Sequence, residues 1–426
     1  MARVFVLGGG LGGVSMAYEL RKTLPRDAHI GVIAERDHFE FTPSNPWVAV
    51  GWRQADQVRV DLRKPFARKR IELVDSAATR IEPEQRRVSL ADGRTIDYDF
   101  LVIATGPELA FDEVPGLGPD GYTTSVCTTT HAQHAFADFE RLIENPGPVV
   151  IGAAQGASCF GPAYEYAFIL ETELRRRKIR DRVPMWFVTP EPYIGHLGLD
   201  GVGDTKSLME SELRERHIRF VTNARIDRVE AGRLHATEVD DSGAPKRAHA
   251  IEFRHAMILP AFRGVAAVRT ASALVNPRGF VQTDALQRNP AHPEIYAVGV
   301  CVAIPPVGPT PIPTGTPKTG YMIESMVTAV AHNIADALAG RTPSHRATWN
   351  ALCLADFGDG GVAFLAVPQI PPRNTNWSSE GKWVHLAKIG FEKYFMHKVR
   401  RGNVEPYYEK VILDLLGAKK LKPEAP

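Results

Sequence analysis

A glycine-rich turn between a short apolar strand and a helix is the feature that most constrains this fold. The sequence predicts a strand over Val4–Leu7, the turn at Gly8–Gly13 and a helix through about Thr23. The turn has the spacing G-x-G-x-x-G. In this spacing the first glycine permits the tight turn, the second lets a pyrophosphate approach and the third lets helix and strand pack closely. Glu35 follows the next expected strand, Ile30–Ala34, where a carboxylate can accept hydrogen bonds from a ribose. Together these features predict a dinucleotide-binding domain.

The same plan recurs about 145 residues later. Val149–Ile151 reads as a strand, Gly152–Gly161 as a turn, Ala163–Arg177 as a helix and Val183–Val188 as the next strand. Two such units indicate an α/β fold with two tandem Rossmann-like domains of the glutathione-reductase-like kind.

Three parts are expected along the chain. The first is a discontinuous FAD-binding domain at 1–108 and 276–345, to which the chain returns through Ile295–Gly299. The second is a Rossmann-like domain at 109–275, and the third a C-terminal region at 346–426 that docks on a membrane through amphipathic helices.

FAD is the expected cofactor because the strand Phe100–Ala104 ends in Thr105-Gly106-Pro107, which is similar to the second FAD-contacting motif of two-dinucleotide flavoproteins. Gly299 is followed by Val300, where many such proteins have an aspartate for the ribityl chain. We assign no metal site. The predicted cofactor-binding residues are Gly8, Gly10, Leu11, Gly12, Gly13, Ala34, Glu35, Arg36, Pro43, Ser44, Asn45, Ala78, Ala104, Thr105, Gly106, Gly299, Lys318 and Gly320.

The second glycine turn argues against a nicotinamide cofactor. If Gly152 is the first motif glycine, the next two motif positions are Ala154 and Ala157. A methyl group at the middle position blocks the close approach of a pyrophosphate. A methyl group at the third position pushes the following helix away from the preceding strand. The alternative function of a type II NADH:quinone oxidoreductase would need those glycines.

Composition excludes several classes of protein. The chain has 51 Lys and Arg against 49 Asp and Glu, so no basic field favours nucleic acid. No signal-peptide pattern and no window of about 18 uninterrupted apolar residues is evident. Four cysteines are too few for a secreted disulfide scaffold.

The cysteines are widely spaced and form no C-x-x-C or C-x-x-x-x-C pair. Cys127, Cys159, Cys301 and Cys353 are therefore reactive thiols or inert core residues. Cys159 lies in the second glycine turn. Cys301 follows an expected buried strand and is interpreted as a small hydrophobic residue.

Six segments, in order along the chain, resemble the three-cysteine sulfide:quinone oxidoreductases of bacteria. They are Ser125–Thr128, Gly156–Glu165, Glu191–Gly198, Pro317–Glu324, Cys353–Asp356 and Trp383–Lys388. The likeness covers nearly the whole chain apart from a variable patch at roughly 230–255.

The resemblance implies that sulfide is oxidised to polysulfide or elemental sulfur and that a membrane quinone is reduced through FAD. A Cys159–Cys353 disulfide, or a sulfur-bridged version of it, would be opened by the hydrosulfide anion to give a persulfide. By resemblance Cys353 lies next to the flavin, Cys159 carries sulfur and Cys127 helps substrate entry or product release.

Three further side chains are assigned to this chemistry. His196 is predicted to hold or move a proton, and Glu165 to act as a base. Lys318, at the end of the proline-rich loop Ala303–Gly320, is expected to place positive charge near the flavin. The structural alternatives are that His196 is an ordinary loop histidine, that Glu165 belongs to a local polar network and that Lys318 is a solvated lysine.

The C-terminal region is expected to contain a loop, Gly358–Arg373, and two helical stretches. Gly381–Pro426 carries ten Lys and Arg against five Asp and Glu. Aromatic residues at helical spacing between 382 and 401 are accompanied by the cations Lys388, Lys393, Lys398, Arg400 and Arg401, and Val411, Ile412, Leu415 and Leu416 repeat the pattern. An apolar face with a basic rim is typical of an interfacial helix, although it would also suit a helix that covers the core.

Quinone rings prefer aromatic walls. By resemblance Phe391 and Tyr408 would enclose the ring, with Pro43, Ser44 and Tyr321 nearby, and we add Phe395 to the predicted quinone site. Peripheral association with either the periplasmic or the cytoplasmic face is compatible with the sequence, and a homo-oligomer is left open. The remaining alternatives are a flavocytochrome-type sulfide dehydrogenase and a non-enzymatic flavin-binding protein.

Overall fold

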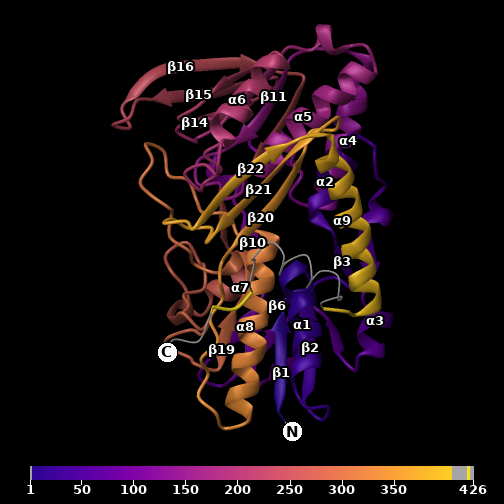
Figure 1. Cartoon of the computed structure of the whole chain (residues 1–426), viewed down its shortest axis with the longest axis vertical. Helices are drawn as coiled ribbons and strands as arrows, with labels where there is room; N and C mark the ends of the chain where they lie inside the picture. The colour runs from indigo at the N-terminus through magenta and orange to yellow at the C-terminus, as the bar shows by residue number, and fades with distance from the viewer. Residues whose placement is uncertain (1, 405–419, 423–426) are drawn as a thin grey trace.

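The computed structural model describes residues 2–404 and 420–422 and has its first domain at the lower end of the long axis (Figure 1). This domain is built on a parallel sheet in the order β19-β9-β1-β2-β5. Val4 and Val6 on β1 are fully buried, as expected for a strand covered on both faces. The strands are β1 (Arg3–Leu7), β2 (His29–Ala34), β5 (Glu72–Asp75), β9 (Phe100–Ile103) and β19 (Ile295–Ala297).

Two helices far apart in the sequence pack together in this domain. They are α1 (Leu11–Thr23), which opens at the first glycine turn, and α8 (Gly320–Leu338), which follows the proline-rich loop. The other elements of this half are β3 (His38–Glu40), α2 (Asn45–Val48), β4 (Arg59–Asp61), α3 (Arg63–Arg68), β6 (Ala78–Glu82), β7 (Arg87–Leu90) and β8 (Thr95–Asp97).

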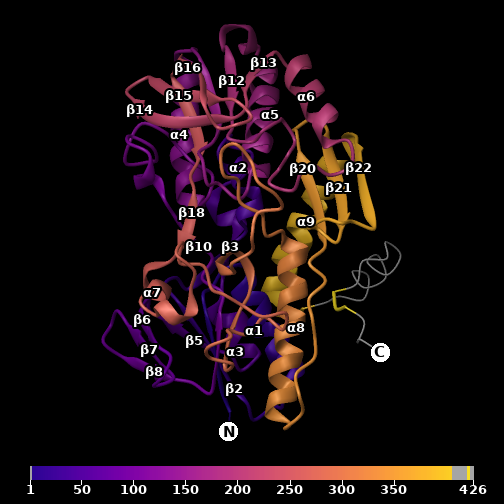
Figure 2. The ribbon, with the colours of Figure 1, turned by 90° about the vertical axis from the view of Figure 1, so that its left-hand side faces the viewer.

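The second domain occupies the opposite end (Figure 2). Its parallel sheet has the order β13-β12-β11-β17, so the predicted pair of Rossmann-like units is confirmed. Strand β12 begins at Met185 rather than Val183, because Pro184 has no N–H to donate within a central strand. The elements are α4 (Thr129–Glu144), β11 (Val149–Ala153), α5 (Gly161–Arg176), β12 (Met185–Val188), α6 (Thr205–Glu215), β13 (Ile218–Val221) and β17 (His255–Leu259).

A short antiparallel pair, β10 and β18, lies where the chain enters and leaves the second domain. A meander, β14-β15-β16, projects from the far end of the molecule. These elements are β10 (Pro107–Leu109), β14 (Ala224–Glu230), β15 (Arg233–Val239), β16 (Pro245–Glu252), β18 (Phe262–Gly264) and α7 (Ala266–Arg269). The domain limits proposed from the sequence stay a prediction.

The C-terminal region corrects one expectation. The predicted loop Gly358–Arg373 contains a strand, which is the centre of an antiparallel sheet in the order β20-β21-β22. Glycines and prolines border this buried apolar strand on both sides, and such a pattern is typical of a loop. The elements are β20 (Ala351–Asp356), β21 (Gly361–Val367), β22 (Thr375–Glu380) and α9 (Lys382–Arg401). The first predicted helical stretch is confirmed as α9, whereas the second lies outside the described residues.

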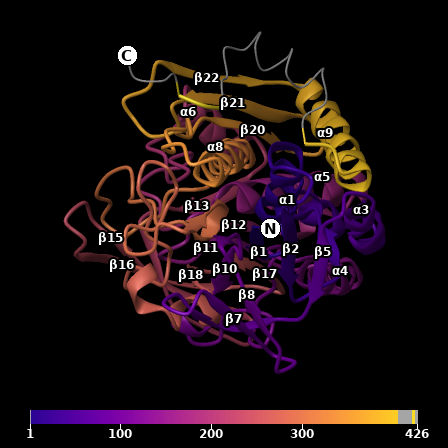
Figure 3. The same cartoon turned by 90° about the horizontal axis from the view of Figure 1, so that it is seen from below.

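Viewed from below, this sheet and α9 form one side of the molecule, next to α8 (Figure 3). Strand β20 packs against α5, α8 and α9. Residues on β20 therefore lie where all three parts of the chain meet. Among the described residues, no helix is long and apolar enough to cross a bilayer.

Candidate active site

The first glycine turn has the shape of a dinucleotide cradle. Gly8 has a φ of 122°, and a Cβ there would clash with Ala104 O. A Cβ on Gly13 would clash with Gly8 O, so helix and strand need this glycine to approach. A Cβ on Gly10, in contrast, meets nothing within 4 Å. The free space beside Gly10 at the N-terminus of α1 would fit the predicted pyrophosphate, whose binding there stays a prediction.

Four other predicted cofactor residues can be placed relative to this turn or to the strands beside it. A Cβ at Gly106 also meets nothing within 4 Å, and a Cβ at Gly12 would contact Ile323 on α8. Gly299 lies beside Ile323 as well, with a φ of 82°. Glu35 is exposed at the end of β2, where it is accessible to a ribose. This cradle fits the two-part FAD site that the sequence predicts.

Three thiols are brought together from distant parts of the sequence. Cys127 precedes α4, Cys159 precedes α5 and Cys353 lies on β20. The charge of Cys159 raises the pKa of Cys353, and that of Cys127 raises the pKa of Cys159. All four cysteines, including Cys301, are free thiols in this structure, so the Cys159–Cys353 disulfide stays a prediction.

Burial is the main cause of the raised thiol pKa values. It raises the pKa of Cys127 to about 11 and that of Cys159 to about 12, and it raises that of Cys353 as well. The nearby Glu165 carboxylate raises the pKa values of Cys159 and Cys353 further. Converting these thiols to thiolates therefore requires a nearby proton acceptor.

Glu165, the predicted base, lies in the first turns of α5. Its carboxylate accepts hydrogen bonds from Lys388 Nζ and from the Asp356 N–H, the latter at 2.7 Å. Burial raises the pKa of Glu165, and the Lys388 ammonium group offsets part of this effect. The pair is almost completely buried, with exposed side-chain fractions of 5% for Lys388 and 9% for Glu165. Glu165 is therefore a buried, proton-sharing carboxylate close to both thiols.

Lys388 and Lys398 correct a second expectation. The sequence placed both on the basic rim of an interfacial helix, but they are only 4% and 3% exposed. Lys398 bonds to Glu324 on α8 at 2.9 Å, so both lysines join α9 to the core. Their carboxylate partners come from distant segments, which the periodicity of α9 alone does not reveal.

Lys318 lies close to the thiols. Burial lowers its pKa to about 8, while the nearby Cys301 and Cys159 favour its charged form. Its Nζ is 5.2 Å from the centre of the Phe280 ring. Lys318 is thus a cation close to the thiol cluster, and its role beside the flavin stays a prediction.

The nucleotide pocket of the second domain is closed. Ala154 and Ala157 are each only 1% exposed. The proline-rich loop pairs with this turn, because the Gly156 N–H donates to Pro313 O at 3.1 Å and the Gly315 N–H donates to Ala157 O at 2.9 Å. Protein backbone therefore lies against the turn that would hold a nucleotide.

The Gln155 side chain ties the same turn to a neighbouring strand. The Gln155 amide group donates to Ile226 O and accepts from the Ile226 N–H, both at 3.0 Å. These paired hydrogen bonds hold the turn to β14, next to the pairing made by the proline-rich loop. The turn therefore lacks the motif glycines and is also covered by protein on the proline-rich loop and on β14, which argues against NAD(P)H binding there.

His196 is buried in a loop that packs on the proline-rich loop. Its Nδ1 accepts a hydrogen bond from the Gly198 N–H at 3.2 Å, and burial lowers its pKa. The sequence did not single out Glu191, which is fully buried and accepts hydrogen bonds from Tyr164, Thr189 and the Leu197 N–H. Burial raises the pKa of Glu191 to about 7. Glu191 organises the His196 loop, and proton transfer by His196 stays a prediction.

An aromatic cluster joins α9 to the loop after β3. The centroid of the Phe41 ring lies 5.9 Å from that of Phe391 and 5.3 Å from that of Phe395. Phe391 is 41% exposed, whereas Phe395 is only 2% exposed and packs against Phe39. Phe391 is therefore the accessible face of this predicted quinone wall.

The remaining predicted quinone residues lie in different settings. Tyr321 is 8% exposed and packs against Leu352, the neighbour of Cys353. Ser44 is buried and donates to Glu392 on α9 at 2.5 Å, while Asn45 Nδ2 donates to Val126 O, next to Cys127. Tyr408 lies outside the described residues.

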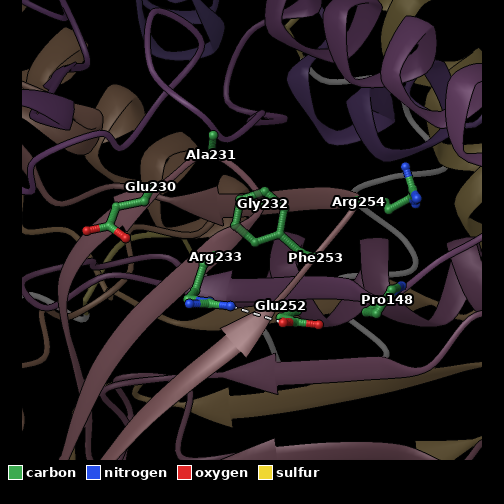
Figure 4. A pocket seen from close by; sticks show the side chains of 8 residues that line it. All are labelled: Pro148, Glu230, Ala231, Gly232, Arg233, Glu252, Phe253 and Arg254. Carbon is green, nitrogen blue, oxygen red and sulfur yellow. Dashed lines mark hydrogen bonds and ion pairs between the residues drawn. The ribbon is translucent and has the colours of Figure 1, made fainter.

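Two surface hollows lie away from the thiols and the glycine cradle. One polar hollow at the turn of the β14–β15 hairpin is lined by Glu230, Arg233, Glu252 and Arg254, with Arg233 and Glu252 paired at 3.1 Å (Figure 4). A second hollow lies between the starts of β12 and β13 and has a basic rim. Neither contains a cysteine or a glycine of the cofactor cradle.

Comparison with known proteins decides between the alternatives. A family model described as pyridine nucleotide-disulphide oxidoreductase matches residues 2–332. The sulfide-quinone reductase of Aquifex aeolicus is 42% identical over 97% of this chain and 94% of that protein. The chain belongs to the sulfide:quinone oxidoreductase family.

Solved structures agree with this assignment. The sulfide:quinone oxidoreductase of Aquifex aeolicus has a TM-score of 0.95 at 40% identity, covering 99% of this chain and 96% of that one. NDH2 of Plasmodium falciparum in complex with NADH has a TM-score of 0.71 at 14% identity, covering 99% and 100%. The second likeness shows a shared fold alone. A sulfide:quinone oxidoreductase can thus keep the fold of an NADH-binding protein while its second nucleotide pocket is closed.

Proposed function

We propose that this protein oxidises sulfide at its three-thiol cluster and passes the electrons through FAD to a membrane quinone. The observation that carries the proposal is the meeting of Cys127, Cys159 and Cys353 beside Glu165 and Lys318. The closed nucleotide pocket of the second domain supports sulfide rather than NADH as the donor.

In the balanced reaction, one hydrosulfide, one quinone and one proton give one sulfane sulfur and one quinol. Hydrosulfide attacks a sulfur of the oxidised cysteine pair, forming a persulfide on Cys159 and releasing Cys353 as a thiolate. Lys318 stabilises the anionic sulfur species that form beside it. A second hydrosulfide attacks the outer persulfide sulfur, which breaks its bond to Cys159 and releases the sulfur as polysulfide or, after repeated cycles, elemental sulfur. The two cysteines would then be reoxidised to the disulfide by loss of two electrons, for which bound FAD would be the acceptor.

FAD, when bound, accepts an electron pair from the sulfur side and gives it to the quinone. Gly8, Gly10 and Gly13 at the start of α1 would hold its pyrophosphate, and Glu35 its adenosine ribose. Thr105 and Gly106 at the end of β9 would hold the second half of the cofactor.

The exposed face of α9 supports docking on a membrane surface. Trp383 is 46% exposed, Leu386 69% and Phe391 41%, while Trp377 on the adjoining β22 is 47% exposed. Lys382, Lys393 and Arg400 are exposed on the same helix. Aromatic and aliphatic side chains between cations suit the headgroup region of a bilayer, from which a lipid-soluble quinone reaches Phe391. This site favours quinone over the haem partner of a flavocytochrome-type enzyme.

Anaerobic mixing tests the proposal. The purified yellow protein is mixed with sulfide or with NADH while the visible flavin absorbance is followed, and a soluble quinone is then added. Sulfide is expected to bleach the flavin and quinone to restore it. Bleaching by NADH and not by sulfide would overturn the proposal, and no bleaching by either would favour a flavin-binding protein without this activity.

A further inference from the structure

A histidine and an aspartate form a pair between the thiol cluster and the surface of α9. Asp356 lies three residues after Cys353 on β20 and is fully buried. Its carboxylate accepts hydrogen bonds from His385 Nδ1 at 2.8 Å, Trp47 Nε1 at 2.6 Å and the Gly358 N–H at 3.0 Å. Three donors satisfy the carboxylate and fix the imidazole in one orientation.

His385 is the accessible member of this pair. Its side chain is 25% exposed, and its ring lies edge-on to Trp47 and Trp52 with centroid distances of 6.3 Å. Nδ1 donates its hydrogen to the Asp356 carboxylate. Nε2 is therefore the ring nitrogen that can exchange a proton with water. A buried carboxylate that orients a partly exposed imidazole is an arrangement suited to proton transfer.

The same elements connect this pair to the thiols. The Asp356 N–H donates to Glu165 Oε1 at 2.7 Å, and Glu165 is paired with Lys388. Lys388 follows His385 by three positions, so both project from one face of α9. Glu165 in turn is close enough to Cys159 and Cys353 to raise their pKa values.

The reaction needs such a connection. Quinone takes up two protons with its two electrons, whereas hydrosulfide supplies only one proton. One proton per turnover must therefore enter from solvent, although the thiol cluster and the Glu165–Lys388 pair are buried.

We propose that His385, oriented by Asp356, exchanges protons between solvent and the buried Glu165–Lys388 pair and so supplies the proton that quinol formation consumes. The inference rests on the proposed function. His385 acts as the exchange group and Asp356 as its positioning residue. Charged groups also surround the two tryptophans that pack on His385. Arg53 and Lys388 lie over the Trp47 ring, Arg176 lies over the Trp52 ring and Trp52 donates to Glu173. Arg53 is paired in turn with Glu392, and Asp356 and Glu165 are the carboxylates on the thiol side.

The test uses two variants of the complete FAD-containing protein. His385→Ala removes the imidazole, and His385→Gln keeps a donor to Asp356 but carries no exchangeable charge. We expect sulfide:quinone turnover to fall at least about tenfold in both, with a changed profile from about pH 6 to about pH 9. Added imidazole is expected to restore turnover in His385→Ala, because the site is partly open to solvent. FAD absorbance and thermal melting should match the wild type.

The control is His397→Ala, which removes an exposed histidine from the same helix. It should keep the wild-type rate and pH profile. Wild-type rates and pH profiles in both His385 variants, or a loss in folded His385→Ala that imidazole does not relieve, would overturn the inference and leave the proposed function intact. A wild-type protein that does not couple sulfide to quinone would instead overturn the proposed function, and this inference with it.

Discussion

The backbone N–H of Asp356 donates a hydrogen bond to Glu165 Oε1 across 191 positions of sequence. This contact ties the strand that carries Cys353 to the helix that follows Cys159. Because the accepting carboxylate is also paired with Lys388 on α9, one buried group joins the sulfur side of the site to the helix of the predicted quinone side.

The thiol cluster leads to the first prediction. Cys159→Ser and Cys353→Ser should each abolish sulfide-dependent bleaching of the flavin while FAD remains bound, because a hydroxyl group cannot form the disulfide or the persulfide. Anaerobic stopped-flow absorbance measures this. Cys301→Ser is the matched control, since the Cys301 thiol donates to Ile103 O and Val298 O at 3.2 Å, as a serine can. Normal turnover in either active-site variant would rule out the disulfide route.

The glycine turn allows folding to be separated from cofactor binding. Gly10→Val should fold but bind flavin at least about tenfold more weakly, because its side chain enters the space meant for a pyrophosphate. Gly13→Val should fail to fold, since even a Cβ there clashes with Gly8 O. Flavin absorbance and circular dichroism distinguish the two. A fully yellow Gly10→Val protein would mean that the cofactor binds elsewhere.

The Glu165–Lys388 pair should show strong coupling in stability. Lys388→Met leaves a buried carboxylate without its cation and should lower the free energy of unfolding by about 3 kcal/mol. The double variant Glu165→Gln/Lys388→Met should regain most of that loss, because no isolated charge stays buried. Urea denaturation of the single and double variants measures the coupling. Additive losses would show that the two groups act independently.

The buried Glu324 carboxylate should make the free energy of unfolding depend on pH in the acid range. Burial alone would raise its pKa, but Lys398 and Lys420 outweigh that effect and lower the pKa to about 2. A depressed pKa stabilises the folded state above the ordinary pKa of 4.5, and this contribution is lost as the pH falls toward 2. Denaturation of wild type and Glu324→Gln across this range should show converging stabilities at low pH. A constant difference would contradict the assignment.

The exposed face of α9 predicts membrane binding. Trp383→Ser together with Leu386→Ser should reduce sedimentation with phosphatidylglycerol vesicles severalfold, and added salt should weaken binding of the wild type. Tyr122→Ser is the control, because Tyr122 is 52% exposed on the second domain. Vesicle binding that is unchanged in the double variant would place the docking surface elsewhere.

The sequence predicts some of these features directly and others only by resemblance. The glycine turns and the strands beside them follow from local spacing, and the structure has them within about two residues. The meeting of Cys159 and Cys353 does not follow from spacing, because the two lie 194 positions apart, and here the likeness to a family supplied the expectation.

Other features were missed for physical reasons. Strand β21 was interpreted as loop because prolines and glycines border it. The burial of Lys388 and Lys398 depends on Glu165 and Glu324, which only the tertiary fold brings to α9. Helical periodicity identifies the face of a helix but not a distant partner that compensates a buried charge.

The main-chain pairing between Gly156–Ala157 and Pro313–Gly315 limits how such a protein could be redesigned. Replacing Ala154 and Ala157 by glycine would restore the motif of a pyridine-nucleotide enzyme without making room for its coenzyme. The proline-rich segment would still occupy that position, and it also carries the lysine beside the thiols. A change of electron donor would therefore require rerouting this segment, at the expense of the sulfur chemistry.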